Sequence, residues 1–161
     1  MKYKLTNETK IVDGVMVYRI QATVDFSDLK KGDLGGFVEK EDNLSQVGSA
    51  WIYDDAVVYG NAKVFEFAKV RDNAKVIDDA KVYGRAIVAN NAKVSENASV
   101  ADRAAVKDGT YIHGNASVVG HAEVLGSTEL LDHVLAFGYA KVRVDVALGG
   151  NSELHNELVL G

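Results

Sequence analysis

Hydrophobic residues recur along most of the chain with a period of six. Aliphatic side chains stand at every sixth position from Ile52 to Leu160, except for the small Ala136. A small residue follows each aliphatic one by four positions, in an unbroken series from Ala56 to Thr128. Inward and outward positions therefore alternate, as in a short strand with one buried face. The next two residues are mostly Gly, Asp, Asn or Glu, which favour turns and tolerate left-handed backbone angles.

This period predicts a coil with three sides. Every repeat presents the same face inward, so three consecutive strands can enclose a narrow core and close one turn every 18 residues. Coils stack at about 4.8 Å, so about six of them make a prism on the order of 30 Å long. An α-helix is excluded because a six-residue repeat drifts around about 3.6 residues per turn, and valine disfavours helix further. We predict an all-β protein, a three-sided parallel β-helix.

The residues before the repeat predict a small sheet that covers the open first coil. Strands are expected at residues 3–7 and 10–26, the second folding back at Asp13-Gly14, a pair typical of tight hairpins. A glycine-rich connector then leads into an irregular first coil that takes in Phe37, Val38 and Leu44. The predicted division is a hairpin cap with its connector at residues 1–43 and a β-helix at residues 44–161.

The connector glycines Gly32, Gly35 and Gly36 have two interpretations. They could cradle a phosphate, or they could simply permit turns. No Walker-type lysine and no dinucleotide-binding spacing follows them. Structural turns are the preferred interpretation.

The repeat also resembles that of a known family. Its pattern, V-x-[GDEN]-[ND]-A-x, resembles the hexapeptide repeat of left-handed parallel β-helix proteins. The resemblance, and not the spacing, implies left-handed coils, against the usual handedness of parallel crossovers. The stretch YRIQATVDFSDLKKGDLGGFVEK, which begins at Tyr18, looks like the start of the YdcK-like group of bacterial and phage hexapeptide proteins. Because members of this group occur in phages, the resemblance implies an accessory role. The protein would then be a phage or prophage protein that engages a host protein.

Composition narrows the classes of partner. The net charge is −5 with 25% charged residues. The chain therefore lacks the excess of basic residues that is typical of nucleic-acid-binding proteins. The chain has no cysteine, so a disulfide framework, a thiolate metal site and a cysteine nucleophile are excluded. No long apolar run or apolar leader is present, which argues against a membrane span or signal peptide. We expect a cytoplasmic protein.

Residues 18 apart should stack into columns on the outside of the coil. Asp54, Asp72, Asn90 and Asp108 share one corner, where oxygen ligands could hold calcium, but corner carboxylates usually serve the turns, so no metal site is predicted. The only cationic edge is the corner of Arg85, Arg103 and His121, a candidate site for an anionic partner or substrate.

Apolar outward positions become frequent toward the C-terminus. One outward column holds Phe65, Tyr83, Ala101, Val119, Phe137 and His155, and the later coils add leucines where the middle coils have lysines. Contiguous exposed apolar patches often mark interfaces. We therefore predict a homo-oligomer formed through the C-terminal coils, with an interface made of Leu125, Leu131, Leu135 and Phe137.

Two classes of function fit these observations. Many left-handed β-helices are acyltransferases that use a histidine base and acyl-coenzyme A in a cleft between subunits, often beside a loop that projects from a coil. The four histidines are His113, His121, His133 and His155, and His121 is the best candidate base because it shares the arginine-rich corner. The register runs from Ile52 to Leu160 without a projecting loop. We therefore favour a non-catalytic binding or scaffold protein without a cofactor over a hexapeptide acyltransferase.

Overall fold

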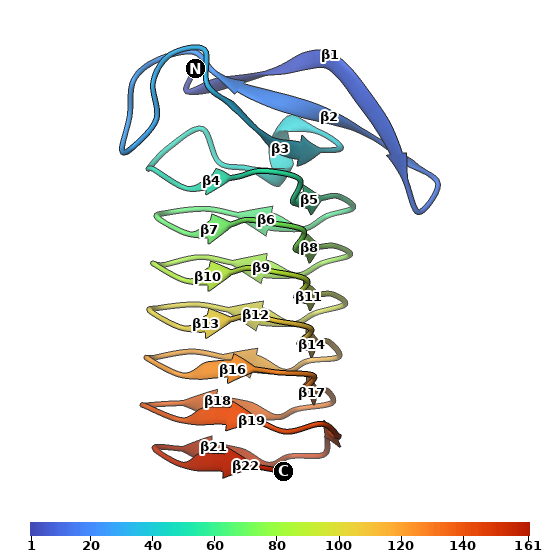
Figure 1. Ribbon diagram of the computed structural model, residues 1–161, viewed down its shortest axis with the longest axis vertical. Helices are drawn as coiled ribbons and strands as arrows, with labels where there is room; N and C mark the ends of the chain where they lie inside the picture. The colour runs from blue at the N-terminus through green and yellow to red at the C-terminus, as the bar shows by residue number, and fades with distance from the viewer.

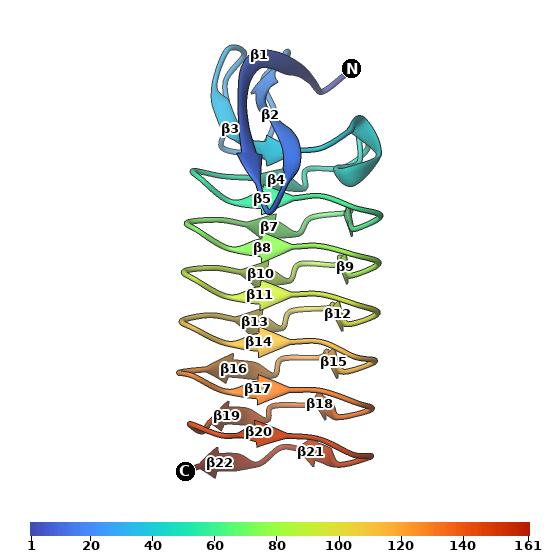
Figure 2. The ribbon, with the colours of Figure 1, turned by 90° about the vertical axis from the view of Figure 1, so that its right-hand side faces the viewer.

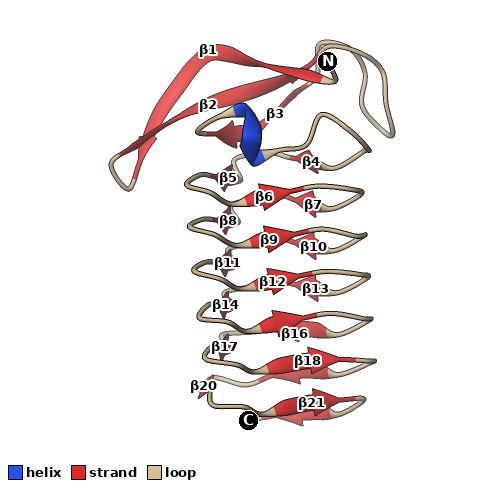
Figure 3. Cartoon of the chain, turned by 180° about the vertical axis from the view of Figure 1, so that it is seen from behind, coloured by secondary structure: helices blue, strands red, loops and turns tan.

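The computed structural model describes residues 1–161, in which short strands joined by turns form three sheets (Figure 1). The nine-stranded sheet contains β1 (Tyr3–Val12), β2 (Val15–Ala22), β3 (Leu34–Val38), β5 (Val57–Val58), β8 (Lys75–Val76), β11 (Lys93–Val94), β14 (Tyr111–Ile112), β17 (Glu129–Leu130) and β20 (Ala147–Leu148). The seven-stranded sheet contains β4 (Trp51–Ile52), β7 (Lys69–Val70), β10 (Ile87–Val88), β13 (Ala105–Val106), β16 (Glu123–Leu125), β19 (Lys141–Arg143) and β22 (Leu158–Leu160). The six-stranded sheet contains β6 (Lys63–Val64), β9 (Lys81–Val82), β12 (Ser99–Val100), β15 (Ser117–Val118), β18 (Leu135–Phe137) and β21 (Glu153–His155). Figure 3 shows the molecule from the side of this sheet.

From β4 on, each strand pairs in parallel with the strand one coil away, which confirms the predicted 18-residue turn. Val76 lies opposite Val94, and Val94 lies opposite Ile112. The chain runs along the seven-stranded, nine-stranded and six-stranded sheets in turn, and the coils are left-handed (Figures 1 and 3). Asp, Asn, Glu and Gly hold the corners at positive φ, as at Asp72 with 60° and Gly84 with 66°. The predicted all-β parallel β-helix is therefore confirmed.

The core is a stack of valines and alanines, as the period predicts. The inward aliphatic residues from Ile52 to Val142 are fully or almost fully buried, and so are the alanines that follow them. Thr110 and Thr128, which replace alanine in two repeats, are also fully buried. Burying one such aliphatic side chain contributes about 1.5–3 kcal/mol, so the repeated core is the main source of stability.

The last coil departs from the predicted register. Val159, and not Leu160, lies opposite Val142, so this turn is one residue shorter than the others. The corner tightens because the Asn156 side chain accepts the Tyr139 amide N–H at 2.7 Å, and the Lys141 amide then bonds to the carbonyl of Glu157. Leu160, predicted to point inward, is 66% exposed.

The predicted hairpin cap is present and is continuous with the β-helix. β1 and β2 pair antiparallel around Asp13 and Gly14, whose φ angles are 50° and 80°. β2 then pairs antiparallel with β3, and β3 pairs in parallel with β5. β3 therefore forms a first rung of the helix, as expected for Phe37 and Val38. This rung lies before the predicted boundary at residue 44, and the helix has about seven turns in place of the six expected.

The glycines of β3 allow close packing. A Cβ atom on Gly35 would lie 2.6 Å from the carbonyl oxygen of Ile52, and one on Gly36 would lie 2.5 Å from that of Ala56. The backbone of β3 therefore presses directly on the next coil, which explains two of the three connector glycines without a phosphate. The single helix, a 3-10 turn at Glu41–Asn43, follows β3.

The tip of the hairpin bends over the outer face of β5 and β8, strands of the same sheet (Figure 2). Val17 packs there in a second buried cluster with Phe37, Val57, Tyr59 and Ile77. Asp13 at the hairpin turn accepts a hydrogen bond from the Tyr59 hydroxyl at 2.5 Å and pairs with Lys75 at 3.1 Å. The cap is thus held by a packed cluster and by polar contacts at its tip.

The top of the core is closed by aromatic residues and one buried lysine. Trp51 is fully buried between Tyr3 and Phe26, both in edge-to-face contact with it. Lys2 is 6% exposed and its Nζ donates to the carbonyls of Gly48 and Ala50. Burial lowers the pKa of Lys2 to about 8. None of the helical structure in this chain is long and apolar enough to cross a bilayer.

Candidate functional site

The acidic corner positions bond to the backbone of the next coil. Asp54 accepts the amide N–H of Asp72, Asp72 accepts that of Asn90, and Asn90 accepts that of Asp108, at 3.0–3.2 Å. This ladder satisfies amide groups at the turns, where the strands are too short to do so. Its carboxylates are therefore structural groups of the corner.

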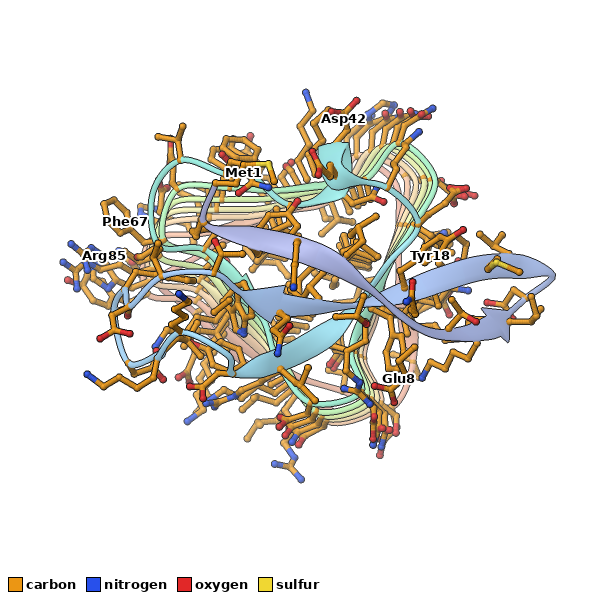
Figure 4. The ribbon with its side chains drawn as sticks, turned by 90° about the horizontal axis from the view of Figure 1, so that it is seen from above. Met1, Glu8, Tyr18, Asp42, Phe67 and Arg85 are labelled. Carbon is orange, nitrogen blue, oxygen red and sulfur yellow. The ribbon has the colours of Figure 1, made fainter.

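A surface groove follows the corner between the six-stranded and seven-stranded sheets. We call this the arginine corner, and its outermost column is Phe67, Arg85, Arg103, His121 and Tyr139, one residue per coil. Viewed along the axis, Phe67 and Arg85 project outward side by side from this corner (Figure 4). The groove has a volume of about 480 Å³ and is lined by Glu66, Phe67, Gly84, Arg85, Asp102, Arg103, Gly120 and His121. The structure thus brings together the three cationic residues predicted to bind an anion.

Stacking holds the two ends of this column. The Arg85 guanidinium lies over the Phe67 ring at 4.9 Å, and the His121 and Tyr139 rings stack at 4.7 Å. Arg85, Arg103 and His121 are exposed, and neither guanidinium makes an ion pair. Both arginines are therefore free to bind a ligand.

The two carboxylates of the groove are directed at the backbone. Glu66 accepts the amide N–H of Gly84 at 2.8 Å, and Asp102 accepts that of Gly120 at 2.9 Å. Each carboxylate thus serves the turn one coil ahead of it. Both carboxylates are exposed like the arginines, but each is held by a turn amide and pairs with neither guanidinium.

A second polar cluster, missed from the sequence, surrounds His113 on the outer face of the nine-stranded sheet. His113 Nε2 lies 2.6 Å from Glu129, its Nδ1 lies 3.6 Å from Glu96, and its ring stacks on Tyr111 at 4.1 Å. His113 and these two glutamates lie on adjacent coils but are offset by one or two positions, because they are 17 and 16 residues apart. A comparison of residues exactly 18 apart therefore overlooks these contacts. With both nitrogens facing carboxylates, His113 is positioned as a bridge between coils.

The other two histidines lie away from the arginine corner. His133 is exposed at the corner that follows β17. His155 is exposed in β21 and stacks on Phe137 at 4.3 Å. Among the four histidines, His121 alone lines the arginine groove.

The four residues of the predicted oligomer interface lie on three different faces. Leu125 is on the seven-stranded sheet and Leu131 follows β17 of the nine-stranded sheet, whereas Leu135 and Phe137 are both in β18 of the six-stranded sheet. All four are half-buried. Only Leu135 and Phe137 share a face, and the predicted interface remains a prediction.

Comparison with known proteins gives a partial relative. No family model matches the sequence. The chain is 35% identical over 65 residues to the protein named "Uncharacterized acetyltransferase YdcK" from Escherichia coli strain K12. The match covers 35% of this chain and 20% of YdcK, so the chain spans about a fifth of the length of the curated relative that it matches. The chain therefore forms a parallel β-helix with a six-residue repeat, and it is similar to YdcK over part of its length.

Proposed function

We propose that this protein is a binding protein that holds an anionic ligand in the groove of the arginine corner. The observation that carries the proposal is the pair of exposed guanidiniums on adjacent coils, Arg85 and Arg103, which make no ion pair while the neighbouring carboxylates bond to turn amides. A guanidinium is always charged and presents a planar set of donors that matches phosphate and carboxylate groups.

The coil spacing defines the ligand that fits. Adjacent parallel strands lie about 4.8 Å apart, so the two guanidiniums are anchored at that separation on a rigid scaffold. Two linked anionic groups can therefore bind one guanidinium each. His121, one coil further, adds a third donor to the same column.

Titration calorimetry with inorganic pyrophosphate tests this proposal. We expect the wild-type protein to bind pyrophosphate, and the double variant Arg85→Ala/Arg103→Ala to bind at least tenfold more weakly. The control is Arg71→Ala. Arg71 is also exposed and makes no ion pair, but it lies outside the groove. Equal affinity in the double variant and the wild type, or no binding by the wild type, contradicts the proposal.

A second candidate function is acyl transfer. Two observations favour it: the similarity to a protein named as an acetyltransferase, and the presence of a histidine in the cationic groove. Acyl-coenzyme A would then bind in a cleft between two copies of the chain, with His121 as the base. Acetyl-coenzyme A should raise the melting temperature, and His121→Ala should abolish turnover that His133→Ala retains. An unchanged melting temperature together with no turnover excludes this function.

A further inference from the structure

We infer that the ligand of the arginine corner is a nucleoside diphosphate, with its base in an apolar groove beside Phe67 and its two phosphates on Arg85 and Arg103. This inference rests on the proposed function and extends it from an anion to a ligand class. It adds an apolar subsite that the proposed function does not use.

The apolar subsite is continuous with the cationic groove. A second groove, of about 300 Å³, is lined by Ser45, Val47, Gly48, Phe65, Glu66 and Phe67. It shares Glu66 and Phe67 with the arginine groove, so the two form one tract along the corner. Val47 is 80% exposed and Phe67 is 48% exposed, which leaves apolar surface open to solvent at this end of the tract.

The order of groups along the tract matches the order of groups in the ligand. Phe67, Arg85 and Arg103 follow one another at intervals of one coil, about 4.8 Å each. A nucleoside diphosphate presents a planar base, a ribose, an α-phosphate and a β-phosphate in that order, so its base and two phosphates follow the order of the three residues. Bases stack on aromatic side chains largely irrespective of sequence, and guanidiniums bind phosphates with paired hydrogen bonds.

The charges of the tract favour a short anion over a nucleic acid. The cationic column contains two arginines and His121, and Phe67 and Tyr139 bound it at either end. Glu66 and Asp102 lie in the same groove and the whole chain carries a net charge of −5, both of which repel an extended polyanion. Two phosphates and one planar ring match Arg85, Arg103 and the apolar groove beside Phe67, and His121 remains as a further donor at the far end.

Calorimetry with ADP, GDP, inorganic pyrophosphate and adenosine distinguishes this inference from the proposed function. We expect both nucleotides to bind at least tenfold more tightly than pyrophosphate, and adenosine to bind weakly. Phe67→Ala should remove the difference between nucleotide and pyrophosphate, and Phe67→Tyr, which keeps the ring, should retain it. Circular dichroism checks that each variant keeps the wild-type fold.

The outcomes separate the two proposals. If pyrophosphate binds through Arg85 and Arg103 but the nucleotides bind no more tightly, the proposed function stands and this inference fails. The same holds if the nucleotide advantage persists in Phe67→Ala. If neither pyrophosphate nor a nucleotide binds, both proposals fail.

Discussion

Thr110 and Thr128 replace the small inward residue in two repeats, and we expect only Thr128 to stabilise the fold. The Thr128 hydroxyl accepts the amide N–H of Val144 at 2.8 Å, and lies 2.7 Å from the carbonyl oxygen of Leu125 and 2.9 Å from that of Val144. The Thr110 hydroxyl lies 3.4 and 3.5 Å from its two carbonyl oxygens. The first hydroxyl therefore makes short bonds, and the second makes only marginal ones.

The difference arises from the corner ladder. At Asp54, Asp72, Asn90 and Asp108 the side chain accepts the amide one coil ahead, and Asp108 in this way satisfies Gly126. Gly126 has no side chain, so the amide of Val144 needs another acceptor, and Thr128 supplies it. Thr128→Val leaves that buried N–H unpaired, which costs about 1–3 kcal/mol, and it also removes a hydroxyl–carbonyl bond worth about 0.5–1.5 kcal/mol.

The assay is urea unfolding followed by circular dichroism, with the free energy of unfolding compared between variants. We expect Thr128→Val to lose about 2–4 kcal/mol. Thr110→Val should lose at most about 0.5 kcal/mol, the lower end of the net contribution of a hydrogen bond, because its two contacts are long. Adding Gly126→Asp to Thr128→Val should recover part of the loss, because aspartates at equivalent positions already adopt φ angles of 57–60°. Equal losses at the two threonines, or no recovery from the aspartate, would refute the ladder argument.

Four further predictions concern the core, the pH dependence and assembly. Gly36→Ala should destabilise the protein by about 2–3 kcal/mol because its Cβ would overlap the next coil, whereas Gly109→Ala, whose Cβ meets nothing nearer than 3.7 Å, should be tolerated in the same unfolding assay. Stability should rise between about pH 8 and pH 10, because burial lowers the pKa of Lys2 to about 8 and the unfolded chain holds the extra proton in this range. In a pH series, Lys2→Met should lack this rise. Burial raises the pKa of Tyr3, Tyr53 and Tyr59 above the usual 10.0, so the folded chain holds protons that the unfolded chain loses above pH 10. Stability should therefore fall above pH 10, and a flat profile there would contradict this. If the C-terminal coils mediate self-association, Phe137→Glu should lower the mass seen by light scattering, and a wild-type mass that stays monomeric across a concentration series would exclude it.

The six-residue period determined most of the architecture. Because side chains alternate along each strand and every third repeat returns to the same sheet, the sequence alone predicts the core residues, the three faces and the columns at the corners. The arginine corner could be predicted in this way, since Arg85, Arg103 and His121 differ by 18 residues each. The hairpin at Asp13-Gly14 could also be predicted from the sequence, because its turn depends on two adjacent residues that accept positive φ.

Tertiary structure decided what the period does not encode. β3 joins the helix because Gly35 and Gly36 permit backbone contact with the next coil, and no repeat marks that rung. The hairpin's position over the nine-stranded sheet depends on packing around Val17, and the His113 bridge depends on diagonal distances across coils. Thr110 and Thr128 look alike in the repeat, yet only the three-dimensional hydrogen-bond ladder gives Thr128 an amide to satisfy. Periodicity determines which residues share a face, whereas contacts between coils depend on distances that only the folded chain defines.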